Sequence, residues 1–238
     1  MLFMVRIVYA LFTTKLKMHQ VLLQIRHIGV GSLSIVFLTG TSIGLALALQ
    51  TYVGLSRFGA HELIGVVVAL GMTRELGPIM TSLMVTGRSG ASMTAELGTM
   101  QISEQIDALR TLCVNPYQYL VIPRIIASMI VTPLLTIFSM LCGIIGGYIY
   151  SVYVLGFTPE SYLAPIRMYS ELSDIMGGLF KSSIFGFILA WVGTYYGYHT
   201  SGGARGVGYA TTSSVVTGSI FILVVNYLLS SLLFQTGN

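Results

Sequence analysis

Long intervals without a charged residue dominate this sequence. No Asp, Glu, Lys or Arg occurs between Arg26 and Arg57, between Arg124 and Glu160, between Lys181 and Arg205, or after Arg205. A helix of about 20 apolar residues crosses the hydrocarbon core of a bilayer. These intervals therefore predict several membrane-spanning helices.

The composition supports the same conclusion. Of the 238 residues, 54% are hydrophobic and 8% are charged, with a mean hydropathy of +0.82, whereas soluble domains contain about 25% charged residues. The net charge of +4 does not indicate a nucleic-acid partner, because the basic residues form no cluster with interleaved aromatics. Cys113 and Cys142 lie far apart in the sequence and predict neither a disulfide framework nor a metal site.

The expected fold is all-α and polytopic, with one domain over residues 1–238. Residues 1–27 are expected to form an amphipathic helix in the membrane interface, because polar residues such as Gln20, Gln24 and His27 recur every three or four positions. A partly ordered tail is the alternative for this segment. Five spans are expected near residues 28–56, 63–97, 125–157, 182–204 and 207–234.

The distribution of basic residues predicts the orientation. With the N-terminus in the cytoplasm, seven basic residues fall on the cytoplasmic side and three on the far side. The cytoplasmic residues are Arg6, Lys15, Lys17, Arg26, Arg110, Arg124 and Arg205, and the far-side residues are Arg57, Arg167 and Lys181. The far side is also expected to carry Glu62, Glu160, Glu171 and Asp174. The C-terminus is then on the far side.

Three Gly-x-x-x-Gly patterns lie within the expected spans. They are Gly40/Gly44, Gly143/Gly147 and Gly193/Gly197. Small residues four positions apart allow helix backbones to approach closely in lipid. We expect these faces to pack within one chain, and a dimer through one of them is the alternative.

The second expected span contains four charged residues: Arg74, Glu75, Arg88 and Glu96. Each ionised side chain near mid-bilayer costs roughly 2.5–3.5 kcal/mol on insertion scales, so these groups must face each other, another helix or water. One interpretation is a polar patch in a substrate pathway, and the other is a set of internal ion pairs. Because Gly77-Pro78 also interrupts this span, we expect a broken helix or one that lines a polar cavity.

Two short motifs resemble catalytic or nucleotide-binding sequences. "GRSG" at residues 87–90, with His199 as a base, would begin an intramembrane serine protease, but small residues here are already explained by helix packing. "SGGARGVG" at residues 201–208 is not followed by the Gly-Lys-Ser/Thr of a P-loop. We therefore expect no catalytic residue, metal site or nucleotide cofactor in this chain.

A short amphipathic helix is expected near residues 103–113, in "SEQIDALRTLCVNP". Ser103 can cap it, its first turns are acidic, and Asn115-Pro116 ends it. Ile102, Ile106 and Leu109 fall on one face. This apolar face predicts a partner on the cytoplasmic side, and packing against the chain's own helices is the alternative.

These segments together resemble a known family. "ALGMTRELGPIMTSLMVTGRSGASMTAELGTMQISEQIDAL", followed by "NPYQYLVIPRIIA", is similar to the MlaE/YrbE family of ABC-transporter permeases. The resemblance implies a homodimer, a cytoplasmic ABC ATPase that binds the ATP, and an MCE-domain lipid-binding protein on the far side. It also implies phospholipid transport between the inner membrane and an outer membrane, with a plastid envelope as the alternative location.

The resemblance also implies roles for particular residues. Arg74 and Glu75 match the family's polar pair beside the lipid cavity, and Leu47, Tyr52 and Leu55 match its apolar wall. The helix that docks on the ATPase corresponds to Glu104, Gln105, Ile106, Asp107 and Leu109. The alternative from another class is an ion- or proton-coupled transporter that uses Glu75 and Glu96 as a relay.

Overall fold

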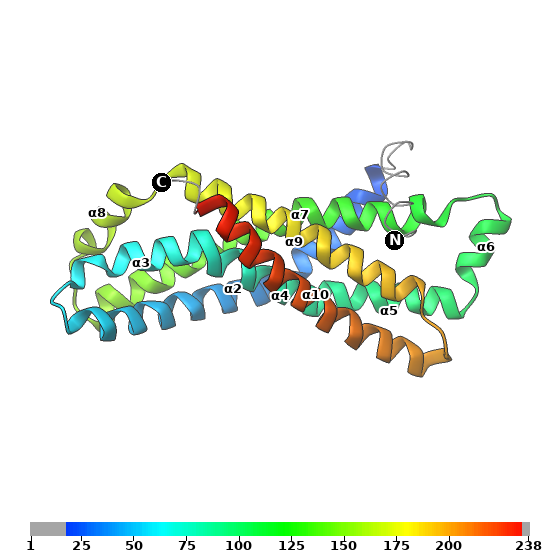
Figure 1. Cartoon of the computed structure of the whole chain (residues 1–238), viewed down its shortest axis with the longest axis horizontal. Coiled ribbons are helices and arrows are strands. Elements are labelled where there is room, and N and C mark those ends of the chain that lie inside the picture. The colour runs from blue at the N-terminus through cyan, green and yellow to red at the C-terminus, as the bar shows by residue number, and fades with distance from the viewer. Residues whose placement is uncertain (1–17, 235–238) are drawn as a thin grey trace. The chain divides into compact units, whose positions relative to one another are not determined.

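The computed structural model describes residues 18–234, which are helical throughout apart from short connections and contain no strand (Figure 1). The first half comprises α2 (Met18–Ser56), the 3-10 turn η1 (His61–Leu63), α3 (Ile64–Gly71), η2 (Met72–Leu76), α4 (Gly77–Val85), η3 (Thr86–Gly90), α5 (Ala91–Ile102) and α6 (Gln105–Thr111). The second half comprises η4 (Tyr117–Val121), α7 (Ile122–Ile149), η5 (Tyr150–Val154), α8 (Pro159–Tyr169), α9 (Leu172–Tyr198) and α10 (Gly203–Phe234). The segments η2 to η5 are π-helical turns.

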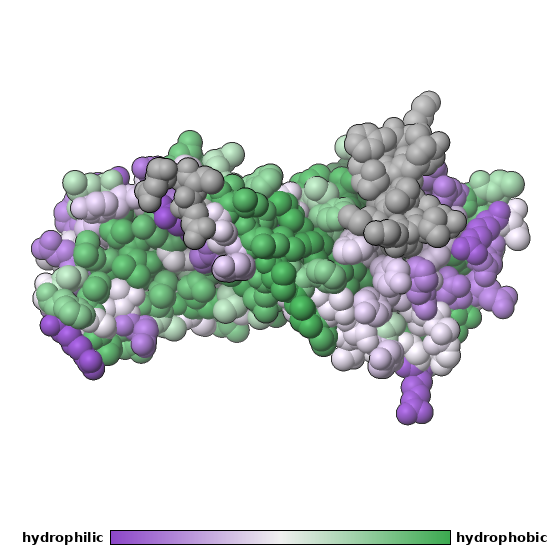
Figure 2. All heavy atoms as spheres, in the orientation of Figure 1, coloured by the Kyte–Doolittle hydropathy of each residue, from purple (hydrophilic) through white to green (hydrophobic). Residues whose placement is uncertain are grey.

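Within the described residues, five helical segments are long and apolar enough to cross a membrane. They are Met18–Ser56, His61–Ile102, Tyr117–Val154, Leu172–Tyr198 and Gly203–Leu233. Hydrophobic side chains also cover much of the surface in view (Figure 2). The predicted all-α polytopic membrane fold is confirmed.

Two of the predicted boundaries differ from the structure. α2 runs without a break through residue 27, so residues 18–27 continue into the first span, and residues 1–17 of the expected interfacial helix lie outside the described part. The predicted start of the fourth span at residue 182 is wrong, because α9 begins at Leu172 and includes Asp174 and Lys181. Charge-free intervals miss this start because both charged groups are buried and paired inside the protein.

The second span is continuous, so of the two alternatives expected for it, a broken helix or one that lines a polar cavity, the broken helix is wrong. The π-helical turn η2 precedes these residues, and the Gly77 N–H bonds to the Met72 carbonyl five residues earlier. Pro78 then lies in the first turn of α4, where a missing N–H is tolerated. A wider helical turn accommodates the proline within a continuous helix.

The chain forms two compact units that alternate along the sequence. In the described residues, unit 1 comprises residues 18–32, 82–132 and 183–225, and unit 2 comprises residues 33–81, 133–182 and 226–234. Helices α2, α4, α7, α9 and α10 each contribute to both units. Unit 1 holds the start of α2, the α5–α6–η4 connection and the α9–α10 turn, and unit 2 holds η1, α8 and the end of α10.

Glycines make the close helix contacts inside each unit. In unit 2, a Cβ on Gly44 would collide with the carbonyl oxygen of Gly143, which joins α2 to α7. In unit 1, a Cβ on Gly197 would lie 2.7 Å from the Leu97 side chain, which joins α9 to α5. The prediction that these glycine faces pack within one chain is confirmed for Gly44 and Gly197.

Candidate functional site: a charged network in unit 2

A buried lysine organises a polar network among η2, α9 and α10. Lys181 Nζ lies 2.8 Å from Glu75 Oε1 and donates to Ser230 Oγ at 2.7 Å. Ser230 Oγ donates to the same Glu75 oxygen at 2.7 Å, and Asn226 Nδ2 donates to Glu75 Oε2 at 2.9 Å. Both carboxylate oxygens of Glu75 therefore accept hydrogen bonds from within unit 2.

Arg74, next to Glu75, pairs with a different residue of α9. Its Nε and Nη2 atoms both lie 2.6 Å from Asp174 Oδ1. Asp174 Oδ2 accepts from the Glu171 N–H at 3.2 Å, so this carboxylate also holds the start of α9. Arg74 and Glu75 are thus both members of internal ion pairs, as one of the two interpretations of the sequence expected.

The local backbone explains why α9 can approach η2 so closely. Pro78 has no N–H to donate to the carbonyl of Arg74 four residues earlier, and Lys181 Nζ donates to that carbonyl at 2.9 Å. Gly178 of α9 lies where a Cβ would collide with the Thr73 carbonyl oxygen. Pro78 and Gly178 together allow Lys181 of α9 to donate the hydrogen bond that the Arg74 carbonyl would otherwise accept from a backbone N–H.

The exposure of the two pairs is asymmetric. The side chains of Lys181 and Asp174 are 0% and 3% exposed, whereas those of Glu75 and Arg74 are 37% and 40% exposed. The buried members neutralise the pairs, and the exposed members can still contact a ligand. An arginine suits a phosphate and a carboxylate suits an ammonium group, so the arrangement can bind a zwitterionic or anionic head group.

The predicted apolar wall lies in the same unit. Leu47, Tyr52 and Leu55 of α2 are partly buried and pack against a core that includes Met72 and Val68. Met72 begins η2 and Leu76, which ends it, also packs against this core. The charged turn and the predicted wall therefore share one hydrophobic cluster.

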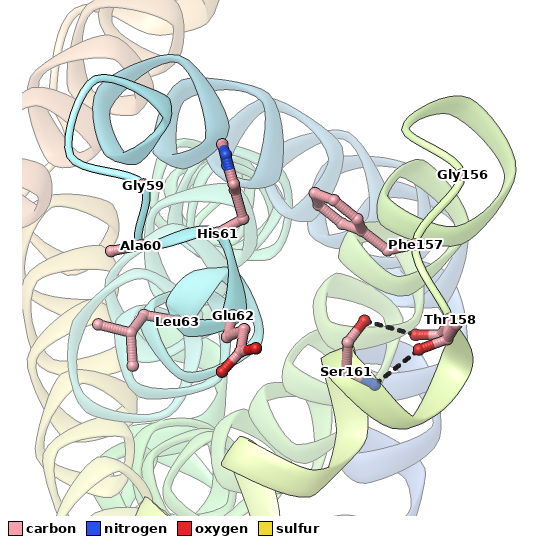
Figure 3. A pocket seen from close by; sticks show the side chains of 9 residues that line it. All are labelled: Gly59, Ala60, His61, Glu62, Leu63, Gly156, Phe157, Thr158 and Ser161. Atoms are coloured by element: carbon pink, nitrogen blue, oxygen red, sulfur yellow. Dashed lines mark hydrogen bonds between the residues drawn. The ribbon is translucent and has the colours of Figure 1, made fainter.

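A pocket of about 600 Å³ adjoins this cluster (Figure 3). It lies between the η1 segment and the connection that leads into α8, where Thr158 caps the helix by accepting from the Ser161 N–H. The rings of His61 and Phe157 line it, and the Tyr52 ring lies 5.6 Å and 6.1 Å from them. Tyr52 therefore connects the predicted wall to this pocket.

Four members of the network are not predicted from the sequence: Asp174, Lys181, Asn226 and Ser230. Asp174 and Lys181 are expected outside the spans, on the far side of the membrane, whereas both lie inside α9. A signal was present, because Asp174, Gly178 and Lys181 recur at helical spacing. Asn226 and Ser230 are likewise four positions apart, in the mostly apolar second half of α10.

The structure places the predicted docking residues on and beside α6. Glu104, Gln105 and Asp107 are exposed and Leu109 is partly exposed. The prediction that Ile106 is an exposed docking residue is wrong, because its side chain is 0% exposed within the chain. Leu112, just after α6, is 72% exposed and was not predicted.

The remaining charged residues of the second span lie in unit 1. Glu96 pairs with Arg124 of α7 at 2.8 Å, and Arg88 donates to Ser32 Oγ of α2 at 3.2 Å. Glu96 and Glu75, the two carboxylates of the alternative relay, are each engaged in an ion pair with their own basic partner, Arg124 and Lys181.

The serine of the "GRSG" motif, Ser89, lacks the surroundings of a catalytic nucleophile. Ser89 is 2% exposed, and its hydroxyl lies 3.3 Å from that of Ser32. His199 Nδ1 lies 2.8 Å from the carbonyl oxygen of Tyr195. Ser89 and His199 therefore do not form the serine–histidine pair that a serine protease requires.

Five spans, a charged network inside one unit and a short helix after the second span define a polytopic α-helical membrane protein. The family described as Permease MlaE matches residues 21–232. The chain belongs to the MlaE permease family.

Several relatives agree with this assignment. A probable ABC transporter permease protein of Rickettsia typhi is 48% identical over 89% of this chain and 82% of its own length. The intermembrane phospholipid transport system permease protein MlaE of Haemophilus influenzae is 35% identical over 90% and 82%. The protein TRIGALACTOSYLDIACYLGLYCEROL 1, chloroplastic, of Arabidopsis thaliana is 37% identical over 97% and 66%.

Proposed function

We propose that this chain is the membrane subunit of an ABC transporter that moves phospholipid between an inner membrane and an outer membrane. Two copies form the permease, a separate cytoplasmic ATPase binds and hydrolyses ATP, and an MCE-domain protein receives or delivers lipid on the far side. The names of the relatives from Rickettsia and Haemophilus support the ABC-permease role and the lipid substrate. The chain itself carries out no chemical step and holds no cofactor.

The observation that carries this proposal is the asymmetric exposure of the network in unit 2. Charge is tolerated inside a span only when it is paired, and Lys181 and Asp174 supply that pairing from buried positions. Arg74 and Glu75 remain partly exposed beside the cluster that includes Leu47, Tyr52 and Leu55. We assign the head group to Arg74 and Glu75 and the acyl chains to this cluster.

The distribution of basic residues supports an orientation with the N-terminus and α6 in the cytoplasm. Arg124 is buried in α7 and Lys181 is buried in α9, so neither counts as a loop charge. Six basic residues against two remain. The exposed residues Glu104, Gln105 and Asp107, together with Leu112, would then face the ATPase.

The lipid site is tested with Arg74→Ala and Glu75→Gln in the purified transporter. Each should lower bound phospholipid and transport about tenfold, which corresponds to the loss of one charge-assisted contact. Arg57→Ala, at an exposed residue outside the network, is the matched control and should leave both unchanged. Mass spectrometry of the same preparation would identify the lipid and the co-purified ATPase.

A purely structural pair would behave differently. Arg74→Ala leaves Asp174, which is 3% exposed, without its guanidinium, and adding Asp174→Asn removes that penalty. If the double variant regained both folding and transport, Arg74 would be structural and the lipid assignment would be wrong. Regained folding without transport supports the lipid site.

A further inference from the structure

Unit 1 contains a second polar region that the proposed function does not use. Two cavities, of about 280 and 370 Å³, share Leu23, Gln24 and Glu96 as lining residues. Their walls come from the start of α2, from α5, and from η4 with the start of α7. Each is far larger than the space of about 30 Å³ that one water molecule occupies, so a larger ligand fits there.

The charges of this region form a matched pair with unequal exposure. Arg124 Nη2 lies 2.8 Å from Glu96 Oε2, and Arg124 Nη1 donates to the Leu120 carbonyl at 2.9 Å. The arginine side chain is 3% exposed, whereas that of Glu96 is 53% exposed. The charged group that is accessible in this region is therefore the Glu96 carboxylate, and its countercharge, Arg124, is buried.

Two buried polar atoms in the same lining lack a hydrogen-bond partner in the described structure: Arg124 Nε, a donor, and Gln20 Oε1, an acceptor. A buried unsatisfied polar atom costs about 1–3 kcal/mol. A ligand with one acceptor group and one donor group would satisfy both. This requirement fits a zwitterion better than a simple anion or cation.

The polar residues of this region lie within about two helical turns of the ends of three candidate spans, Met18–Ser56, His61–Ile102 and Tyr117–Val154, and we therefore place the region near the level of lipid head groups. Gln20 and Gln24 lie in the first described turns of α2, Arg124 lies in the first turn of α7, and Glu96 lies in the middle of α5. The adjacent surface of α2 is apolar, with Leu22 and Leu23 58% and 52% exposed. Acyl chains can therefore extend along α2 while the head group occupies the cavity.

We propose that this cavity binds the head group of a phospholipid with a primary ammonium, from the leaflet at which α2 begins. The ammonium group donates to Glu96 and Gln20, and the phosphate accepts from Arg124 and Gln24. In the orientation proposed above this is the cytoplasmic leaflet. The site belongs to unit 1 and uses none of the residues of the network in unit 2.

The test uses the full chain in lipid nanodiscs with a photoreactive acyl chain on phosphatidylethanolamine or on phosphatidylglycerol. Cross-linked peptides are identified by mass spectrometry. The ethanolamine probe should label peptides from α5 and from the starts of α2 and α7 more strongly than the glycerol probe. Equal labelling by the two probes would overturn the proposal.

Two variants separate the ligand contact from folding. Glu96→Gln keeps an acceptor for Arg124 but removes the charge, and should lower ethanolamine labelling at this site about tenfold. Leu23→Trp, at an exposed residue that lines both cavities, should narrow them without removing either charge of the ion pair and lower labelling similarly. Glu160→Gln, an exposed carboxylate in α8, is the control and should change nothing. Undiminished labelling in either Glu96→Gln or Leu23→Trp would refute the site.

Discussion

Arg110 of α6 donates a hydrogen bond to the hydroxyl of Tyr198, the last residue of α9, over 2.5 Å. This bond raises the pKa of the Arg110 guanidinium, which also pairs with Asp107 at 2.6 Å. The Tyr117 ring stacks on that of Tyr198 at 5.0 Å. The short helix is therefore attached to α9, the helix that also carries Asp174 and Lys181.

Tyr198→Phe should loosen α6 without removing the ring stack. The lost hydrogen bond is worth about 1 kcal/mol, which corresponds to roughly fivefold more frequent local opening. Hydrogen exchange at the amides of residues 105–111 should accelerate accordingly. Tyr209→Phe, at a residue that is 77% exposed, provides the control, and unchanged exchange in Tyr198→Phe would refute this attachment.

Two substitutions distinguish the buried from the exposed apolar side of the α6 region. Ile106→Asp places a charge in a fully buried position, so the protein should lose several kcal/mol of stability and purify poorly. Leu112→Asp, at a residue that is 72% exposed, should leave folding intact and reduce co-purification of the ATPase. Normal ATPase binding by a well-folded Leu112→Asp protein would exclude Leu112 from the docking surface.

Lys181→Met should destabilise unit 2 by about 3 kcal/mol, because Glu75 loses its buried countercharge. This loss is at the low end of the range for a broken buried ion pair, because Glu75 is 37% exposed and partly screened by solvent. Adding Glu75→Gln should recover part of the loss, as measured by thermal unfolding in detergent. Ser230→Ala, which removes only hydrogen bonds, should cost about 1 kcal/mol. Equal melting temperatures for Lys181→Met and the unmodified protein would contradict this account.

Gly44→Ala should destabilise the α2–α7 contact by about 1–3 kcal/mol, because the added Cβ collides with the Gly143 carbonyl oxygen. Gly54 of the same helix has no atom within 4 Å of an added Cβ. Gly54→Ala should therefore be neutral or slightly stabilising, since alanine favours a helix over glycine. Thermal unfolding of the two variants measures the contrast, which a similar loss in both would contradict.

The spans were predictable because hydropathy over a helix length depends on composition more than on tertiary contacts. The start of α9 was not predictable in this way. In the sequence, Asp174 and Lys181 look like loop charges. In the structure they pair with Arg74 and Glu75, which lie roughly a hundred positions away in the sequence. Ile106 is a similar case. An apolar helical face predicts that Ile106 is buried, but the sequence does not show whether a partner protein or the chain itself buries it.

Arg74 and Glu75 themselves were identified from the sequence, because a charge inside an apolar span is costly and therefore conspicuous. Their partners, Asp174 and Lys181, were not identified. The sequence shows that these two residues have helical spacing, but it does not show which other helix they face. The exposure asymmetry that separates Glu75 from Lys181 depends on three-dimensional packing alone.

The π-helical turn η2 has a consequence at the level of the gene. Such a turn is equivalent to one extra residue accommodated within an α-helix, and here the turn carries both Arg74 and Glu75. Deletion of one codon within η2 would return this stretch to α-helical spacing while α3 and α4 keep the faces that they already bury. A change of one residue in chain length can thus change the direction in which the charged side chains of η2 point, separately from the residues that hold the span in place.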